Sequence, residues 1–256
     1  MTLIMKDAYE GGVLLLTLNK PEKKNALSDD LLAALADEID AADLDDELRV
    51  VVITGAEGCF AAGADINRFN KFDNISCRRD QRPKLWEQIA KCAKPLIAAV
   101  EGWCLGAGTE LALHCDIVIA GERAQFGLPE VTLGIMPGAG GTQRLPRTIG
   151  KSDAMLMALS GDRFDAHQVK AMGLISEVTG EGESKIRCLE IARRIARRAP
   201  LAVEAAKRSV LQSYETGLTS GLVTERDLYV QIFATKDRVE GVSAFLQKRQ
   251  ADFKRL

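Results

Sequence analysis

The chain has 256 residues, of which 46% are hydrophobic and 27% charged, with a formal net charge of −2. This length predicts one large domain, or one domain with an appendage, and allows a sizeable buried core. The near-balanced charge argues against a protein dedicated to nucleic acids or anionic membranes. No apolar run approaches the ~20 residues of a membrane span. The first residues lack the basic and long apolar regions of a signal peptide, so we expect a cytoplasmic protein.

The apolar, β-branched runs predict the strands of an α/β core. Residues 13–18, 49–55, 96–100 and 116–120 form such runs, and the last three are typical of strands covered on both faces. Ser28 is the predicted N-cap of a helix that runs to about Asp43, because apolar residues recur four apart along it. Strands that alternate with helices or loops indicate an α/β fold with right-handed crossovers.

Polar and charged residues dominate residues 68–84, and we predict a long loop over residues 67–82. A loop of this length is either a lid over a site or a disordered excursion.

The second half of the chain is predicted to be helical. Asp165 and Gln168 have the spacing of a capping box, and Gly173 stands where a helix would end. Pro200 marks a sharp break and suits the first turn of the next helix. We therefore predict a core with the active site over residues 1–199 and a C-terminal helical region over residues 200–256.

Six cysteines and two histidines offer little material for a metal site or a nucleophilic triad. The cysteines form no C-x-x-C pair, and most lie in apolar surroundings, which predicts reduced core residues. His114 and His167 are too few for a His-based metal site or a Ser-His-Asp triad. We expect no metal.

Two glutamates lie within mostly apolar stretches of the sequence. Glu110 and Glu130 are each the one acidic residue in a mostly apolar window punctuated by Gly or Pro. A buried, unpaired carboxylate is costly and its pKa tends to rise, and two that converge can work as an acid and a base. The alternative is that they are buried carboxylates that cap neighbouring amides.

Three segments rich in small residues surround these glutamates in the sequence. Residues 59–66 follow a predicted strand and allow a ligand or a second segment to approach the backbone closely, or they form a tight packed turn. Residues 102–113 open a helix whose free N–H groups, near Gly106 and Gly108, can bind an oxyanion, or they simply pack closely. Residues 134–145 lack the Lys of a phosphate loop, so we expect them to shape an apolar pocket or a subunit contact.

Taken together, these motifs resemble the enoyl-CoA hydratase (crotonase) family. The resemblance rests on residues 60–66, 105–112, 126–130, 134–145, 234–241 and 243–249. The motifs occur in family order and spacing over essentially the whole chain.

The resemblance implies a spiral of ββα units with a C-terminal helical region that builds trimers, often paired into hexamers. It implies the reversible syn addition of water to a 2-trans-enoyl-CoA. No tightly bound cofactor is implied, since coenzyme A enters as part of the substrate.

The resemblance also implies roles for particular residues. The backbone N–H groups of Ala64 and Ala107 match the oxyanion hole, where many members carry Gly at the second position. Glu110 and Glu130 match the two catalytic glutamates: Glu110 would hold and deprotonate water, and Glu130 would deliver a proton to C2. The remaining matches to substrate- and coenzyme A-binding positions are Lys24, Ala26, Ala62, Asp65, Ile66, Trp103, Leu105, Gly106, Pro129, Leu133 and Gly138. Asn67 stands where many relatives have Lys or Glu.

The sequence leaves open which reaction, which class of function and which substrate apply. Isomerisation of a 3-enoyl-CoA, or another enolate reaction, would use the same oxyanion hole, although isomerases often need only a carboxylate at position 130. An RNA-binding role is disfavoured by the net charge, and the basic run 193–198 is more simply a helix face or a subunit contact. Within the family, residues 82–86, 127–133 and 252–254 are most similar to the dehydroadipyl-CoA hydratases of phenylacetate breakdown. Such a substrate needs a cation for its terminal carboxylate, with Arg68 and Arg82 as candidates.

Overall fold

The computed structural model describes residues 2–256, apart from the side chain of Lys71. The main sheet has six strands in the order β1 (Ile4–Tyr9), β2 (Val13–Leu18), β3 (Val50–Gly55), β4 (Leu96–Val100), β6 (Ile117–Gly121) and β9 (Glu177–Thr179). β1 and β2 pair antiparallel, and every other neighbouring pair is parallel. A second sheet contains β5 (Trp103–Leu105), β7 (Gln125–Gly127) and β8 (Phe164–Asp165).

The chain passes between the two sheets in repeated ββα units. β4 of the main sheet is followed by β5 of the small sheet and then by α4 (Ala107–His114). β6 and β7 repeat this order and lead into the short helix η4 (Pro129–Leu133), then α5 (Gly141–Ile149) and α6 (Lys151–Ser160). α7 (Ala166–Met172) connects β8 to β9. The expected α/β spiral is therefore confirmed.

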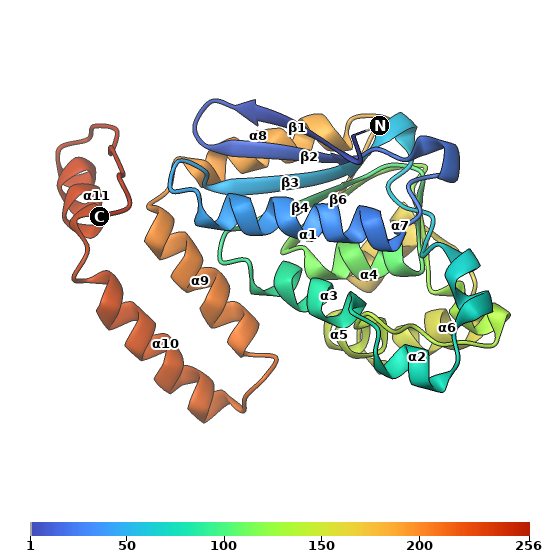
Figure 1. Cartoon of the computed structure of the whole chain (residues 1–256). Helices are drawn as coiled ribbons and strands as arrows, with labels where there is room; N and C mark the ends of the chain where they lie inside the picture. The colour runs from blue at the N-terminus through green and yellow to red at the C-terminus, as the bar shows by residue number, and fades with distance from the viewer. Residues whose placement is uncertain (1) are drawn as a thin grey trace.

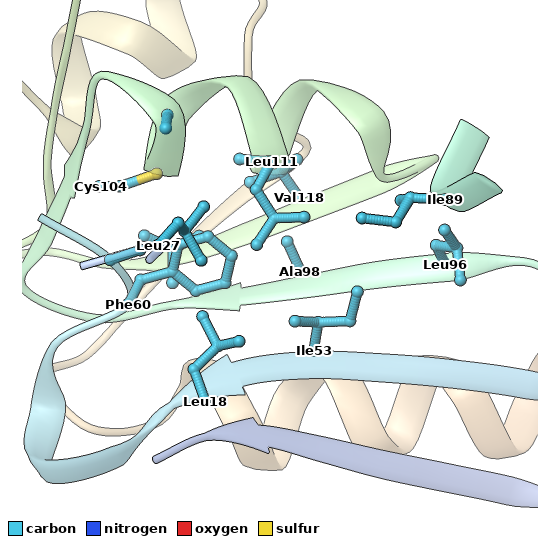
Figure 2. Packing of buried hydrophobic residues seen from close by; sticks show 14 of the residues in the cluster. Leu18, Leu27, Ile53, Phe60, Ile89, Leu96, Ala98, Cys104, Leu111 and Val118 are labelled. Carbon is cyan, nitrogen blue, oxygen red and sulfur yellow. The ribbon is translucent and has the colours of Figure 1, made fainter. Parts of the chain in front are cut away.

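Alternating strand residues divide the core between the two faces of the main sheet. On one face Leu16, Ile53 and Ala98 belong to a large cluster with α1 (Asp29–Leu44) and α4, and Figure 2 shows Leu111 of α4 pointing toward these strands. On the other face the intervening residues pack against α8 (Ser184–Ala196), which lies behind the sheet in Figure 1. Burial on both faces explains why these strands read as continuous apolar runs.

The four predicted strands and the first helix are present, and Ser28 is the N-cap of α1. The capping box of Asp165 and Gln168 is also present, and Gly173 ends α7 in the left-handed conformation. The sequence analysis did not identify β1 or the three short strands of the small sheet.

The predicted loop over residues 67–82 is wrong. The segment contains the short helices η3 (Ile66–Lys71) and α2 (Asn74–Arg78), and α3 (Arg82–Lys91) begins at its end. Its polar residues act as caps: the Asp65 side chain accepts from the Asn67 N–H, and Asp73 accepts from that of Ser76. The polar side chains of this segment form hydrogen bonds with the ends of helices. Loops contain the same residue types, so composition alone does not distinguish the two. Two further short helices, η1 (Pro21–Lys23) and η2 (Ala56–Gly58), follow β2 and β3.

The C-terminal helices α9 (Pro200–Gln212), α10 (Leu218–Ile232) and α11 (Lys236–Leu246) extend away from the sheet (Figure 1). Pro200 occupies the first turn of α9, as predicted. Lys207 fastens α9 to the core, because its Nζ donates to the Lys94 carbonyl at 2.8 Å and pairs with Asp116 at 2.7 Å. The boundary between residues 199 and 200 stays a prediction. None of the helices within residues 2–256 is long and apolar enough to cross a membrane.

Candidate active site

Two backbone segments that are far apart in the sequence lie side by side at the ends of β3 and β4. The Ala61 N–H donates to the Trp103 carbonyl at 2.8 Å, and the Leu105 N–H donates to the Ala61 carbonyl at 3.0 Å. Gly108 makes the close approach feasible, because a Cβ at that position would overlap the Ala61 carbonyl oxygen. The segments that precede Ala64 and Ala107 are thus held against each other by backbone bonds.

Both segments end in a free backbone donor. Within residues 2–256, the N–H groups of Ala64 and Ala107 donate no hydrogen bond. Ala107 is the first residue of α4, where an N–H has no partner inside its own helix. Gly106 turns the chain into this helix with a φ of 51°, a conformation that favours glycine. The residues that precede these donors lie close together, since a Cβ on Gly106 would be 3.7 Å from the Gly63 Cα, so the two unpaired donors lie on adjacent segments.

Glu110 lies one turn into α4 and is 3% exposed. Its Oε1 accepts from the N–H groups of Ala139 at 2.7 Å and Gly141 at 2.9 Å. Burial raises the pKa of Glu110, while the two N–H donors and the charge of Arg82 oppose the rise. The hydrogen bonds hold one carboxylate oxygen and fix the orientation of the other. Glu110 therefore caps amides, as one reading of the sequence expected, and it also stays beside the unpaired donors.

Glu130 occupies the first turn of η4 and has different surroundings. Its Oε2 is buried and has no hydrogen-bond partner in the described part of the chain. A Cβ at Gly106 would come within 3.0 Å of its Oε1, so this carboxyl lies directly over the start of α4. Burial, assisted by the negative charge of Glu110, raises the pKa of Glu130 to about 7. Burial thus raises the pKa of both carboxyl groups, but only Glu110 has backbone N–H donors from Ala139 and Gly141 that favour its ionised form.

His114, at the end of α4, is unsuited to acid–base work near neutral pH. The Nδ1 of His114 is 2.8 Å from the Glu110 carbonyl oxygen, and its ring lies against that of Trp86. Burial lowers its pKa to about 4. Among the residues that the structure describes, no group of three or more His, Cys, Asp or Glu side chains is arranged to hold a metal ion.

Several residues matched to coenzyme A binding meet at one side of the site. The Ala62 N–H donates to the Lys24 carbonyl at 3.0 Å, and the Lys24 Nζ lies 3.6 Å from the centre of the Trp103 ring. Ala26 follows in the same turn and is half-buried, and Lys24 itself is exposed. These four residues form a partly open surface that leads to the free N–H of Ala64.

The remaining matches are more dispersed. Leu105 and Gly106 are buried beside the unpaired donors, and Pro129 opens η4 next to Glu130. Asp65 caps η3 and pairs with Lys23 at 3.4 Å. The side chains of Ile66 and Leu133 are 56% and 58% exposed, and Gly138 is exposed on the loop before α5. The structure does not bring these last three into the buried site.

The sequence analysis missed the residues that hold Glu110. It assigned residues 134–145 to a pocket wall or a subunit contact, whereas the N–H groups of Ala139 and Gly141 bind the Glu110 carboxylate. A Gly-rich turn into a helix presents free N–H groups to an anion, and in this protein the anion is a side chain of the same chain. The available signal was the Gly-rich start of α5. Arg68 and Arg82 were candidates for binding the terminal carboxylate of a substrate. In the structure both form ion pairs with aspartates of their own chain.

The fold and the site define a ββα spiral in which two buried carboxyl groups lie beside two unpaired backbone donors. Residues 8–255 match the family model described as enoyl-CoA hydratase/isomerase. The chain is 53% identical over 242 residues to a 2,3-dehydroadipyl-CoA hydratase of Escherichia coli K12, with 94% of this chain and 95% of that protein covered. It is 42% identical to a mitochondrial enoyl-CoA hydratase of Pongo abelii, over 94% of this chain and 83% of that protein.

A solved structure gives the same result. The crystal structure of an enoyl-CoA hydratase from Bacillus anthracis superposes with a TM-score of 0.95 at 37% identity, and the match covers 100% of both chains. The chain belongs to the enoyl-CoA hydratase/isomerase family.

Proposed function

We propose that this protein is an enoyl-CoA hydratase, which adds water reversibly to a 2-trans-enoyl-CoA and gives a 3-hydroxyacyl-CoA. Membership of the family and the names of its relatives support this reaction. The observation that carries the proposal is a pair of carboxyl groups with different hydrogen-bond surroundings, Glu110 held by two N–H groups and Glu130 with an unpartnered Oε2, near two free backbone donors.

The N–H groups of Ala64 and Ala107 would bind the thioester oxygen. Attack of water at C3 moves negative charge onto that oxygen as the enolate forms. Two fixed donors stabilise the charge, and one such donor typically contributes ~3 kcal/mol. The donors cost no reorganisation because the backbone bonds of both segments already hold them.

The two glutamates would divide the proton transfers. The two N–H groups that bind Glu110 favour its ionised form against the effect of burial, so this carboxylate suits the water that must lose a proton. Glu130 carries a proton near pH 7, so it suits delivery to C2 of the enolate. Water and proton would both come from the side of the substrate that faces the glutamates, which predicts syn addition.

Isomerisation of a 3-enoyl-CoA to a 2-enoyl-CoA is the second candidate, because the family includes both reactions. That reaction only moves a proton between carbons and needs one carboxyl group. The presence of a second, firmly held carboxylate at Glu110 favours hydration. The test is to mix the protein with crotonyl-CoA: hydration removes the ultraviolet absorption of the conjugated thioester. A gain of that absorption from a 3-enoyl-CoA, without loss from crotonyl-CoA, would refute the proposal.

For the acyl chain, we propose 2,3-dehydroadipyl-CoA as a substrate, on the strength of the 53% identity to a protein of that name. Coenzyme A would lie along Lys24, Ala26, Ala62 and Trp103 and would enter only as part of the substrate. Comparing kcat/KM for dehydroadipyl-CoA, crotonyl-CoA and longer straight chains tests this. A marked preference for plain chains would refute the dicarboxylate assignment.

We also propose that the chain works as a homotrimer or a pair of trimers, in the cytoplasm. The support is the exposed apolar face of the C-terminal helices: Leu218, Leu222, Tyr229, Phe233, Phe245 and Leu246 are each at least 45% exposed. Such a face on a single chain indicates a contact surface. Sedimentation at micromolar concentration tests the assembly, and a stable monomer would contradict it.

A further inference from the structure

The segment that contains η3 and α2 is closed against α1 by a ring of four charged residues. The Arg68 guanidinium pairs with Asp29 at 3.1 Å and with Asp80 at 3.0 Å. Arg82 completes the ring: its Nη1 pairs with Asp29 at 3.0 Å, and its backbone N–H donates to Asp80 at 3.1 Å. Asp80 thus binds the backbone at the start of α3, whereas the Arg82 side chain is held by Asp29.

Arg82 makes one contact that Arg68 lacks. Its Nη1 also donates to the Leu27 carbonyl at 2.9 Å, and its side chain is only 9% exposed. Leu27 in turn donates its N–H to the Gly63 carbonyl at 2.7 Å and forms a parallel bridge with Ala64. Leu27 is fully buried, and Figure 2 shows it in the core with Phe60. Two hydrogen bonds, one on each side of the Leu27 Cα, therefore connect the Arg82 guanidinium to the peptide that carries the free N–H of Ala64.

We propose that Arg82 is a positioning residue for the oxyanion hole: by fixing the backbone of Leu27 it holds the Gly63–Ala64 peptide in the orientation that aims the Ala64 N–H at the thioester oxygen. This inference rests on the proposed role of Ala64. Arginine suits the task because its planar fork binds the carbonyl and the Asp29 carboxylate at once, in fixed relative directions. A small rotation of the Ala64 peptide would lengthen a bond that matters most in the transition state.

The test compares Arg82→Met with a control in the same ring, Asp80→Ala. The first removes both side-chain bonds of Arg82, and the second removes the bonds of Asp80 but leaves those of Arg82 to Leu27 and Asp29. For crotonyl-CoA, we expect Arg82→Met to lower kcat by ~10- to 100-fold, as for a misplaced oxyanion donor, with KM changed by less than about threefold. Asp80→Ala should change kcat by less than about threefold.

A spectroscopic probe separates positioning from other effects of the charge. 4-Dimethylaminocinnamoyl-CoA is a push–pull thioester whose absorption moves to longer wavelength when donors polarise its carbonyl. We expect wild type and Asp80→Ala to give the same red shift, and Arg82→Met to give less than about half of it at saturating probe. A lower kcat with the full red shift in Arg82→Met would overturn the proposal. Arg82 would then act through its charge on Glu110 and not through the orientation of Ala64. Equal losses in both variants would overturn it as well.

If Arg82→Met does not fold, Arg82→Lys gives the same test, because it keeps the charge but lacks the planar fork. At least about a threefold loss of kcat with a reduced red shift is then expected, and wild-type values of both would overturn the proposal. The probe also separates the two proposals. A wild-type red shift that depends on Arg82, in a protein that does not hydrate crotonyl-CoA, would refute the hydratase assignment and leave this inference standing.

Discussion

Replacing Glu130 with Gln should lower activity and raise stability in the same protein. The Oε2 of Glu130 is buried without a partner, and its pKa is raised from the ordinary 4.5 to about 7. At about 1.4 kcal/mol for each pH unit between these values, the full linkage is about 3 kcal/mol, which partial exposure reduces to about 2 kcal/mol. Gln keeps the shape and cannot ionise.

The sign follows from proton binding. Below pH 4.5 the glutamate is protonated in the folded and unfolded states, and its raised pKa costs nothing. Between pH 4.5 and about 7 the unfolded chain releases the proton while the folded protein retains it, so stability falls as the pH rises. Above about pH 7 the loss is complete. Relative to wild type, Glu130→Gln should therefore gain about 2 kcal/mol at pH 8 and almost nothing at pH 4.5.

Urea unfolding at several pH values measures the difference, and crotonyl-CoA hydration at pH 7 measures the activity. We expect a loss of kcat of about 100-fold or more, typical of a removed general acid. The exposed Glu122→Gln is the matched control and should change neither quantity. A stability gain independent of pH, or near-wild-type hydration by Glu130→Gln, would refute the reasoning.

Three further predictions follow from the same contacts. The kcat/KM of wild type should decline above about pH 7 as Glu130 loses its proton, and a flat profile to pH 9 in stopped-flow assays would contradict its role as the acid. Gly108→Ala should destabilise the protein by about 2 kcal/mol in urea and lower kcat, because the added Cβ overlaps the Ala61 carbonyl; wild-type behaviour would mean that the two segments separate easily. Lys207→Met should destabilise the protein by about 1 kcal/mol, because it removes the ion pair with Asp116 and the hydrogen bond to the Lys94 carbonyl, and adding Asp116→Asn should recover part of the loss; no recovery would count against the ion pair.

The main strands were predictable because they are buried on both faces, so every residue along each strand is apolar or nearly so. The strands of the small sheet, such as Trp103–Leu105, are too short for any period to show. The segment 67–82 misled the prediction because Asp65 and Asp73 serve helix ends, and Arg68 and Asp80 form ion pairs, with side chains that look like those of a loop.

The glutamates of the site were predictable for a local reason, since each is the one charge in its own apolar window. The groups that hold these glutamates in place were not predictable from the sequence. Ala139 and Gly141 act through backbone N–H groups, which carry no residue-type signal, and they reach Glu110 across about 30 positions of sequence. The connection from Arg82 to Leu27 spans 55 positions and depends on how η3 and α2 fold. Contacts of this kind follow from the tertiary structure and not from spacing.

We propose that Glu110 and Glu130 act together from one side of an enoyl thioester whose oxygen is bound by Ala64 and Ala107. Hydration of crotonyl-CoA in D2O tests it most directly, because the product then carries deuterium at C2 and oxygen at C3 in a fixed relative configuration that proton NMR reads. Two carboxyl groups on one side of the substrate predict syn addition. Anti addition, or a mixture of the two configurations, would contradict this account.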